Sequence, residues 1–409
     1  HIAANIDATR YAFGIDDVEI EDYEATTSVS AGQLKEDAQA LPAIRLMDPQ
    51  IIGPTFEQLQ QVRGYYKFAD TLDVDRYEID GNRADAVVAA RELDLESVES
   101  GETWNNKRTV YTHGNGLVAA YGNQRVSNGE PLFFSGGIPT VGKLPEHETR
   151  IYFGERSDQW VVAGAPDDSE PVELDTPGGG ESGEETLNTY QGTGGVPVGN
   201  IATRAMFAVR FGDVNLMLSD RVNSESRLLF NRTPLERVQE AAPWLIPDQD
   251  PYPSVVDGRI VWIVDAYTTT DQFPNSMKLD WTQAISDTRT DAASMLADTQ
   301  VNYVRNSVKA TVDAYDGTVT LYEWDEEDPI LKTWDKVFPG VVTPKSEISD
   351  ELMAHLRYPL DLFKAQRQTL GRYHTKNTHT WYQQSDIWEV PNDPVSGQEQ
   401  LKEPPYYLT

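Results

Sequence analysis

The stretch PYPSVVDGRIVWIVDAYTTT, residues 251–270, says most about the fold of this chain. Asp257-Gly258 separates two runs rich in Val, Ile and aromatic residues, and an Asp-Gly pair in that position is typical of a tight β-hairpin. The same pattern predicts a second hairpin at Asp316-Gly317 and a third at Asp80-Gly81. The strands of this protein are therefore expected to pair mainly with their neighbours along the chain.

Helical patterns lie on both sides of the hairpin of residues 251–270. Residues 201–222 carry apolar side chains at helical spacing, with an interruption at Gly212, and Thr233 begins another helix with Pro in its first turn. A further helix is predicted from Ser349 and is broken or kinked at Pro359. Because strands and helices do not alternate regularly, the sequence predicts an α+β fold, with antiparallel hairpins or a mixed sheet packed against several amphipathic helices.

The first part of the chain carries the same mixture. A helix capped by Thr55 is expected over FEQLQQVRGYYKF, residues 56–68, with one apolar face that includes Tyr66. Residues 109–121 and 151–162 are strand candidates.

Composition suggests two lobes. Residues 165–199 are rich in Gly, Pro and acidic residues and contain no Lys or Arg, which predicts a surface loop or linker. We expect an N-terminal α+β lobe over 1–164, a C-terminal α+β lobe over 200–390 and an irregular tail over 391–409. A long insertion within one domain would give the same pattern.

Charge and cysteine content exclude several classes of function. The 409 residues include 66 acidic and 34 basic side chains, a formal net charge of −32, which repels nucleic-acid phosphates. The chain has no Cys, so disulfides, thiolate zinc sites and Cys nucleophiles are excluded. It also has no run of about 18 apolar residues of the kind that spans a bilayer.

Catalytic signatures are missing as well. The sequence contains no HExxH, GxSxG or Walker A motif, and the spacing of His374 and His379 fits helix capping or solvation better than metal binding. His113, in YTHGNG, is the one weak catalytic candidate, because a polar side chain in a Gly-bearing turn after a strand can lie beside a surface cleft. No cofactor is expected.

Calcium is the metal that clustered carboxylates would suit best. Asp73, Asp75 and Asp80 precede a Gly turn, and Asp325 and Asp328 form a second acidic group. Hard oxygen ligands of this type can bind Ca²⁺, although neither group has EF-hand spacing. An acidic surface turn is the alternative interpretation of both groups.

Nearly the whole chain resembles the extracytoplasmic region of uncharacterised protein family 0182, a family of large bacterial membrane proteins. The resemblance rests on several long phrases: NIDATRYAFGIDDVE from Asn5, TFEQLQQVRGYYKFADTLDVDRYEIDG from Thr55, TVYTHGNGLVAAYGN from Thr109, FAVRFGDVNLMLSD from Phe207, DQDPYPSVVDGRIVWIVDAYTTTD from Asp248, NYVRNSVKATVDAYDGTVTLYEWDEEDPIL from Asn302 and HLRYPLDLFKAQRQTLGRYH from His355. Arg accounts for 22 of the 34 basic residues, which favours a high-GC organism such as an actinobacterium.

The resemblance implies a location but no mechanism. Family members carry several membrane-spanning helices before this region, so the chain is expected to be the soluble extracytoplasmic part of such a protein, at the cell membrane. We therefore expect a non-catalytic interaction or assembly platform whose partner is an envelope or membrane protein. The alternative is an envelope-acting hydrolase or glycan-binding protein that uses His113, acidic residues and exposed aromatic residues such as Trp104 or Trp160.

Overall fold

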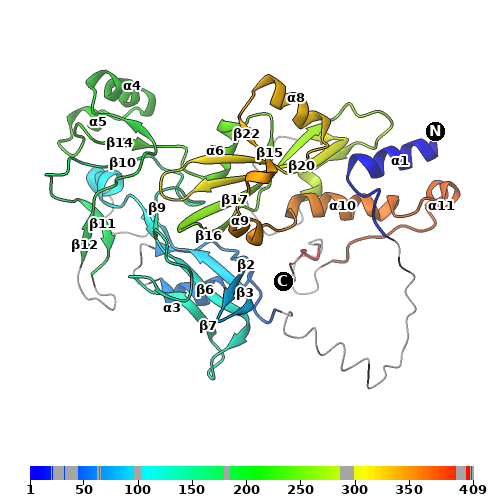
Figure 1. The fold of residues 1–409 in the computed structure, drawn as a ribbon, viewed down its shortest axis with the longest axis horizontal. Helices are drawn as coiled ribbons and strands as arrows, with labels where there is room; N and C mark the ends of the chain where they lie inside the picture. The colour runs from blue at the N-terminus through cyan, green and yellow to red at the C-terminus, as the bar shows by residue number, and fades with distance from the viewer. Residues whose placement is uncertain are drawn as a thin grey trace.

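Two sheets form the centre of the protein in this computed structural model (Figure 1). The structure describes residues 1–19, 21, 32, 45–61, 64, 66–95, 103–178, 185–285, 299–392, 402–405 and 407. The larger sheet contains β15 (Ile246–Pro247), β16 (Tyr252–Val256), β17 (Arg259–Thr270), β20 (Tyr303–Asp313), β21 (Val319–Glu323) and β22 (Val342–Thr343). The second sheet has the order β2 (Asp73–Ile79), β3 (Asn82–Ala90), β6 (Leu117–Arg125), β7 (Pro131–Gly136) and β8 (Val141–Gly142). All strand pairs of these two sheets are antiparallel except the parallel pair β21–β22. With the helices around these sheets, the structure confirms the α+β class.

All three predicted hairpins are present. Asp257 and Gly258 join β16 to β17 with φ of 51° and 76°, and Asp80 and Gly81 join β2 to β3 with φ of 54° and 77°. Positive φ at both central residues is the type I′ geometry that Asp-Gly pairs favour. The turn between β20 and β21 is longer than two residues, and within it Gly317 has φ of 71°.

The helical pattern of residues 201–222 forms two helices. The first, α4 (Ile201–Phe211), ends at Gly212, which has a left-handed conformation, and α5 (Asn215–Leu218) follows. Thr233 caps α6 (Pro234–Ala241) through a reciprocal capping box with Glu236. The sequence signals at these helix ends are therefore confirmed.

Pro359 ends one helical segment and begins the next. Ser349 caps α9 (Asp350–His355), and α10 (Leu360–Tyr373) starts directly after Pro359, so the expected break is confirmed. Proline tolerates the first turn of a helix but not its interior.

Two predictions for the first part of the chain were wrong, and a third was right only at its ends, because within residues 151–162 only parts of β9 (Arg150–Ile151) and β10 (Val161–Ala163) form strands. Helix α3 (Gly53–Gln60) begins before Thr55 with Pro54 in its first turn, and it ends at Gln60, so Tyr66 belongs to a strand. The expected strand over 109–121 begins instead with a five-residue π-helix, η3 (Asn106–Val110). Tertiary contacts override local pattern at both places.

Shorter elements complete the fold. They are α1 (Ile2–Ala12), β1 (Tyr66–Lys67), β4 (Glu92–Leu93), β5 (Gly114–Asn115), β9 (Arg150–Ile151), β10 (Val161–Ala163), β11 (Glu173–Thr176), β12 (Thr186–Asn188), β13 (Val196–Pro197), β14 (Arg227–Leu229), β18 (Leu279–Asp280), α7 (Trp281–Ile285), β19 (Gln300–Val301), α8 (Pro329–Val337), η5 (Lys345–Glu347) and α11 (Thr378–Gln383). None of the helices that the structure describes is both long and apolar enough to cross a membrane.

The segment of residues 165–199 is more than a loop. It contains β11 and β12, which pair with each other, and β13, which pairs with β14. Most of the predicted tail, residues 391–409, lies outside the described residues; within the described part, Asn392 bridges to Lys402.

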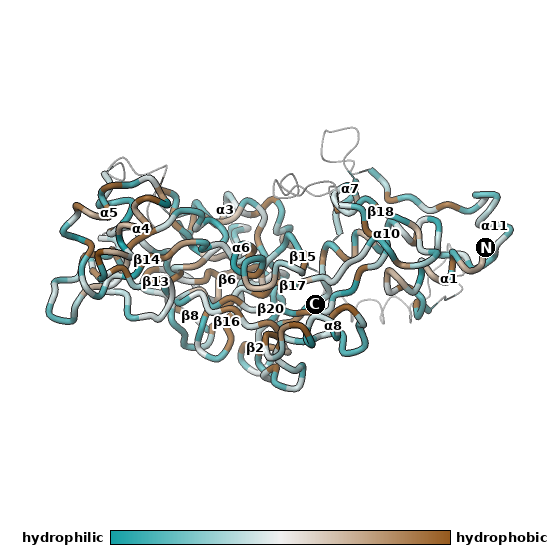
Figure 2. Tube along the Cα trace, turned by 90° about the horizontal axis from the view of Figure 1, so that it is seen from above, coloured by the Kyte–Doolittle hydropathy of each residue, from teal (hydrophilic) through white to brown (hydrophobic). Residues whose placement is uncertain are grey.

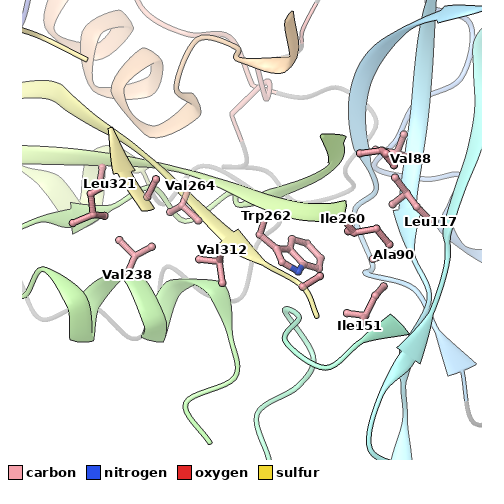
Figure 3. Packing of buried hydrophobic residues seen from close by; sticks show 14 of the residues in the cluster. Val88, Ala90, Leu117, Ile151, Val238, Ile260, Trp262, Val264, Val312 and Leu321 are labelled. Carbon is pink, nitrogen blue, oxygen red and sulfur yellow. The ribbon is translucent and has the colours of Figure 1, made fainter. Parts of the chain in front are cut away.

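The main hydrophobic cluster joins the two central sheets (Figure 3). Trp262 on β17 is 1% exposed, and its Nε1 donates a hydrogen bond to the carbonyl oxygen of Phe153 at 2.9 Å. Val88 and Leu117, from the second sheet, belong to the same cluster. Residues of both expected lobes therefore pack together, while the division into domains stays a prediction.

Candidate functional site

His113 lies inside the protein. It precedes β5 and is 1% exposed, so the expectation that it borders a surface cleft was wrong. Its Nδ1 lies 2.9 Å from the carbonyl oxygen of Gly114, which fixes Nδ1 as the protonated nitrogen, and its buried Nε2 has no hydrogen-bond partner in the described part of the chain. Burial lowers the pKa of His113, although the nearby Glu173 carboxylate opposes that shift.

Glu173 organises this interior region. It lies on β11, within the segment expected to be a surface loop, yet it is buried. Its Oε2 accepts hydrogen bonds from the hydroxyls of Thr112 at 2.8 Å and Tyr152 at 2.7 Å. Its Oε1 accepts the backbone N–H groups of Gly164 and Tyr190, each at 2.9 Å. Four donors satisfy this buried carboxylate, which gives it an anchoring role in the fold.

We expect His113 to make stability depend on acidic pH. The pKa of His113 is lower in the folded state than in the unfolded state. The contribution of neutral His113 to the free energy of unfolding is therefore complete above the unfolded pKa of about 6.5. It is lost as pH falls below that value, by up to about 1.4 kcal/mol per pH unit. Urea titrations of wild type and His113→Gln at several pH values between 5 and 8 measure this slope. The slope should flatten in His113→Gln and persist in the control His379→Gln, since His379 is exposed. Equal slopes in all three proteins would contradict the assignment.

Asp73 and Asp75 lie on one face of β2, as their spacing requires. Both oxygens of Asp75 lie 2.9 Å from Nδ1 of His355, and Oδ2 also accepts the hydroxyl of Ser254 at 2.7 Å. Asp73 lies 3.4 Å from the Arg357 guanidinium, and burial raises its pKa well above the ordinary value. The two carboxylates thus face the segment that joins α9 to α10, about 280 residues later in the chain.

The other three calcium candidates lie apart from that pair. Asp80 is exposed in a hairpin turn and pairs with Lys143 at 2.5 Å, and Asp325 lies 3.7 Å from Arg305. Asp328 caps α8 from a buried position. Among the described residues, no three His, Asp or Glu side chains form a group that could hold a metal ion. Calcium binding stays a prediction.

His374 and His379 lie at the ends of two different helices. His374 lies at the end of α10, where its Nδ1 is 3.0 Å from the Leu370 carbonyl oxygen and its Nε2 is 3.1 Å from Asp386. His379 lies in the first turn of α11. The contact with the Leu370 carbonyl supports helix capping for His374.

Exposed apolar side chains gather on α4 and α5, at one end of the elongated molecule (Figures 1 and 2). Helix α4 has no buried residue. We define the α4–α5 face by five large side chains with exposed fractions between 62% and 84%, namely Ile201, Met206, Val209, Val214 and Leu218. The sequence identified the apolar periodicity of this helix, and such a pattern usually marks a buried side. Here the structure leaves it in contact with solvent.

Aromatic side chains pack against the opposite side of α4. Phe211 stacks on Trp160 with ring centres 5.3 Å apart, and Phe207 packs on Phe230 at 5.4 Å. Trp104 donates from Nε1 to Asp213 at 2.7 Å, in the turn between α4 and α5. Trp104 and Trp160 are half-buried and serve as packing residues here, so neither is the freely exposed aromatic side chain expected for sugar stacking.

Charge also distinguishes the α4–α5 face from the rest of the chain. Residues 201–221 carry three arginines and two aspartates, a net +1, whereas the whole chain has −32. A patch of large apolar side chains that lacks the general negative charge is typical of an interaction surface.

Comparisons with known proteins agree on a family. The model of the uncharacterised protein family UPF0182 matches residues 1–409. Relatives called UPF0182 protein include one from Clavibacter michiganensis, 50% identical over 409 residues, and one from Leifsonia xyli, 48% identical over 410 residues. Another from Tropheryma whipplei is 48% identical over 423 residues.

The chain is shorter than these relatives. It matches over 99% to 100% of its own length but spans only 41% of the Clavibacter and Leifsonia proteins and 44% of the Tropheryma protein. No solved structure matches it. With a family match over its full length and many actinobacterial relatives, the chain belongs to the uncharacterised protein family UPF0182.

Proposed function

We propose that this chain is a non-catalytic interaction platform within a longer protein of the cell envelope, and that it binds a protein partner through the α4–α5 face. The proposal includes the location that the family resemblance implies, outside the cytoplasmic membrane in a membrane-embedded parent. The observation that carries the docking role is the exposure of five large apolar side chains on two consecutive helices and the turn between them.

The way α4 is held supports this role. Its inner side packs on Trp160 and Phe230, so the outer side chains project from a helix whose position is fixed. A surface that is rigid before binding loses little conformational entropy when a partner arrives. Met206 adds an unbranched, adaptable side chain near the centre of the exposed stripe.

The charge and the apolar side chains of the α4–α5 face indicate what kind of partner surface would bind it. The α4–α5 face is apolar, its segment has a net charge of +1, and it belongs to a strongly acidic chain. A complementary surface has an apolar hollow for Met206 and Val209 and a neutral or acidic rim near Arg210 and Arg221. An envelope or membrane protein with such a hollow fits better than nucleic acid, which the overall charge repels.

A crosslinking experiment tests the platform in the full-length protein in its own cells. A photo-crosslinking amino acid at Val209 should give one dominant protein adduct, because Val209 is the most exposed residue of the face. The matched control is Asn128, exposed in the turn between β6 and β7.

A charge at the face should abolish that adduct. We expect Met206→Glu to reduce crosslinking from position 209 at least tenfold, since burying an unpaired carboxylate costs more than about 1.4 kcal/mol. The melting temperature should stay within about 2 °C of wild type, since Met206 is 65% exposed. Equal crosslinking from positions 209 and 128, or an adduct that survives Met206→Glu, would overturn the proposal.

A further inference from the structure

A polar cavity of about 340 Å³ is lined by none of the five residues that define the α4–α5 face. Its walls come from the end of β4, the end of the π-helix η3, the loop before β10 and the residue that precedes the cap of α6. They are formed by Leu93, Asp94, Leu95, Tyr111, Glu155, Arg156, Ser157, Asp158, Gln159 and Arg232. A π-helical turn at a cavity wall is a recurrent feature of functional sites.

The two arginines of this cavity have different roles. Arg232 is buried and donates to three backbone carbonyl oxygens, those of Thr112 and Tyr152 at 2.6 Å and of Gln159 at 2.9 Å, so it builds the wall. The Arg156 side chain makes no hydrogen bond or ion pair with any residue in the described part of the chain, and its Nε is buried. The buried Nε of Arg156 is thus a donor without an acceptor, and a bound anion would supply one.

Glu92 supports the loop that carries Arg156. Its Oε2 accepts the backbone N–H of Arg156 at 3.0 Å and lies 3.4 Å from the Ser157 hydroxyl. The loop approaches so closely that a Cβ at Gly154 would lie 2.1 Å from the same oxygen. Any larger residue at 154 would force the Glu92 carboxylate to move from its place behind the cavity wall.

Two carboxyl groups near the cavity have raised pKa values. Burial raises the pKa of Glu92 to about 7, and burial together with neighbouring carboxylates raises the pKa of Glu155 well above its ordinary value. Asp158 is exposed, where water screens its charge. When Glu92 and Glu155 are protonated, Asp94 and Asp158 are the remaining acidic side chains of the cavity wall, beside the guanidinium groups of Arg156 and Arg232.

We propose that this cavity binds an oxyanionic group, a carboxylate or a phosphate-type group, through Arg156, and that Glu92 takes up a proton as the anion binds. The guanidinium offers paired N–H donors in the geometry that two oxygens of such a group accept. An anion beside Glu92 disfavours its ionised form, so anion binding and protonation strengthen each other. The site is independent of the platform function and can be tested without it.

Calorimetric titration of the 409-residue chain with sulfate and with acetate, at constant ionic strength, tests the anion site. Both ions keep their charge between pH 6 and pH 8, and they separate phosphate-type from carboxylate recognition. Arg156→Gln should weaken binding at least tenfold, because the neutral amide cannot form the charge-assisted hydrogen bonds of the guanidinium. The control Arg83→Gln should bind as wild type, since Arg83 is exposed on β3. Absence of binding by either anion, or equal affinity of both variants, would overturn the proposal.

The proton coupling has its own readout. Wild type should bind the anion at least threefold more tightly at pH 6 than at pH 8, and Glu92→Gln should remove that difference while it keeps the hydrogen bond to the Arg156 N–H. A pH dependence that persists in Glu92→Gln would refute the role of Glu92. If Arg156→Gln does not fold by circular dichroism, Arg156→Lys keeps the charge without the paired donors and should bind several-fold more weakly.

Discussion

Replacing Asp328 by Ala is expected to lower the free energy of unfolding by about 4 kcal/mol. Asp328 is 1% exposed at the start of α8. Its carboxylate accepts hydrogen bonds from the hydroxyls of Thr268 at 2.6 Å and of Tyr303 and Ser307 at 2.7 Å. It also accepts the backbone N–H groups of the first turn of α8. Alanine would leave buried donors without an acceptor, which costs more than the loss of a surface cap.

The control for this substitution is Asp328→Asn, which keeps a side-chain oxygen for capping but loses the charge. We expect Asp328→Asn to lower the free energy of unfolding by about half as much as Asp328→Ala, because asparagine caps helices nearly as well as aspartate. Chemical denaturation with a fluorescence readout measures both. A loss below about 1 kcal/mol for Asp328→Ala would contradict the role of this carboxylate.

The pH dependence of the same site has a definite sign. Burial opposes ionisation of Asp328, but hydrogen bonds from Thr268, Tyr303 and Ser307 outweigh it and lower its pKa. Because the pKa of Asp328 is lower in the folded state, the ionised carboxylate stabilises the fold above the unfolded-state pKa of about 3.9. That stabilisation is lost as pH falls through the folded-state pKa. Asp328→Asn should therefore show a weaker loss of stability below pH 4 than wild type.

Replacing Trp262 by Ala is also expected to cost about 4 kcal/mol, because large-to-small changes in a packed core typically cost about 3–5 kcal/mol. The indole lies in the cluster between the two central sheets, and its Nε1 bonds to the Phe153 carbonyl oxygen at 2.9 Å (Figure 3). The matched control is Val141→Ala, at a position 61% exposed, which should change stability by less than about 0.5 kcal/mol.

This substitution also tests the division into lobes. Trp262 lies in the expected C-terminal lobe, while Val88 and Leu117 of the same cluster lie in the expected N-terminal lobe. If the lobes unfold together, Trp262→Ala shifts one calorimetric transition as a whole. A second transition that keeps its wild-type temperature would show that the N-terminal lobe is an independent domain.

The proposed docking face and the proposed anion cavity depend on the same supporting elements. Arg108, on the π-helix, lies over the Trp160 ring at 4.0 Å and donates to the Trp160 carbonyl oxygen at 2.7 Å. The Trp160 ring in turn packs under α4, while Tyr111, at the end of the π-helix, lines the cavity. The two proposed sites therefore share structural support from Trp160 and the π-helix η3.

Local features of the sequence determined the hairpins and several helix ends. Asp-Gly pairs favour positive φ at both central turn positions, so the turns at Asp80 and Asp257 follow from residue type alone. Thr233, Ser349 and Pro359 mark helix ends through hydrogen bonds and steric limits that involve only nearby residues. These short-range interactions explain why the α+β class could be predicted without the structure.

The candidate sites depended on contacts between residues far apart in the chain. Asp75 meets His355 across 280 positions, and Glu173, in an apparent loop, is buried beneath Tyr152. Hydrophobic periodicity identified α4 as amphipathic, but it could not show that Phe207 and Phe211 would pack inward, partly buried, and that Val209 would be left exposed. Composition and local propensity carry no information about which surfaces meet, because burial is fixed by the packing of the whole chain. The sequence by itself therefore determined the local elements and the family, whereas the tertiary structure alone decided which polar and apolar groups lie together.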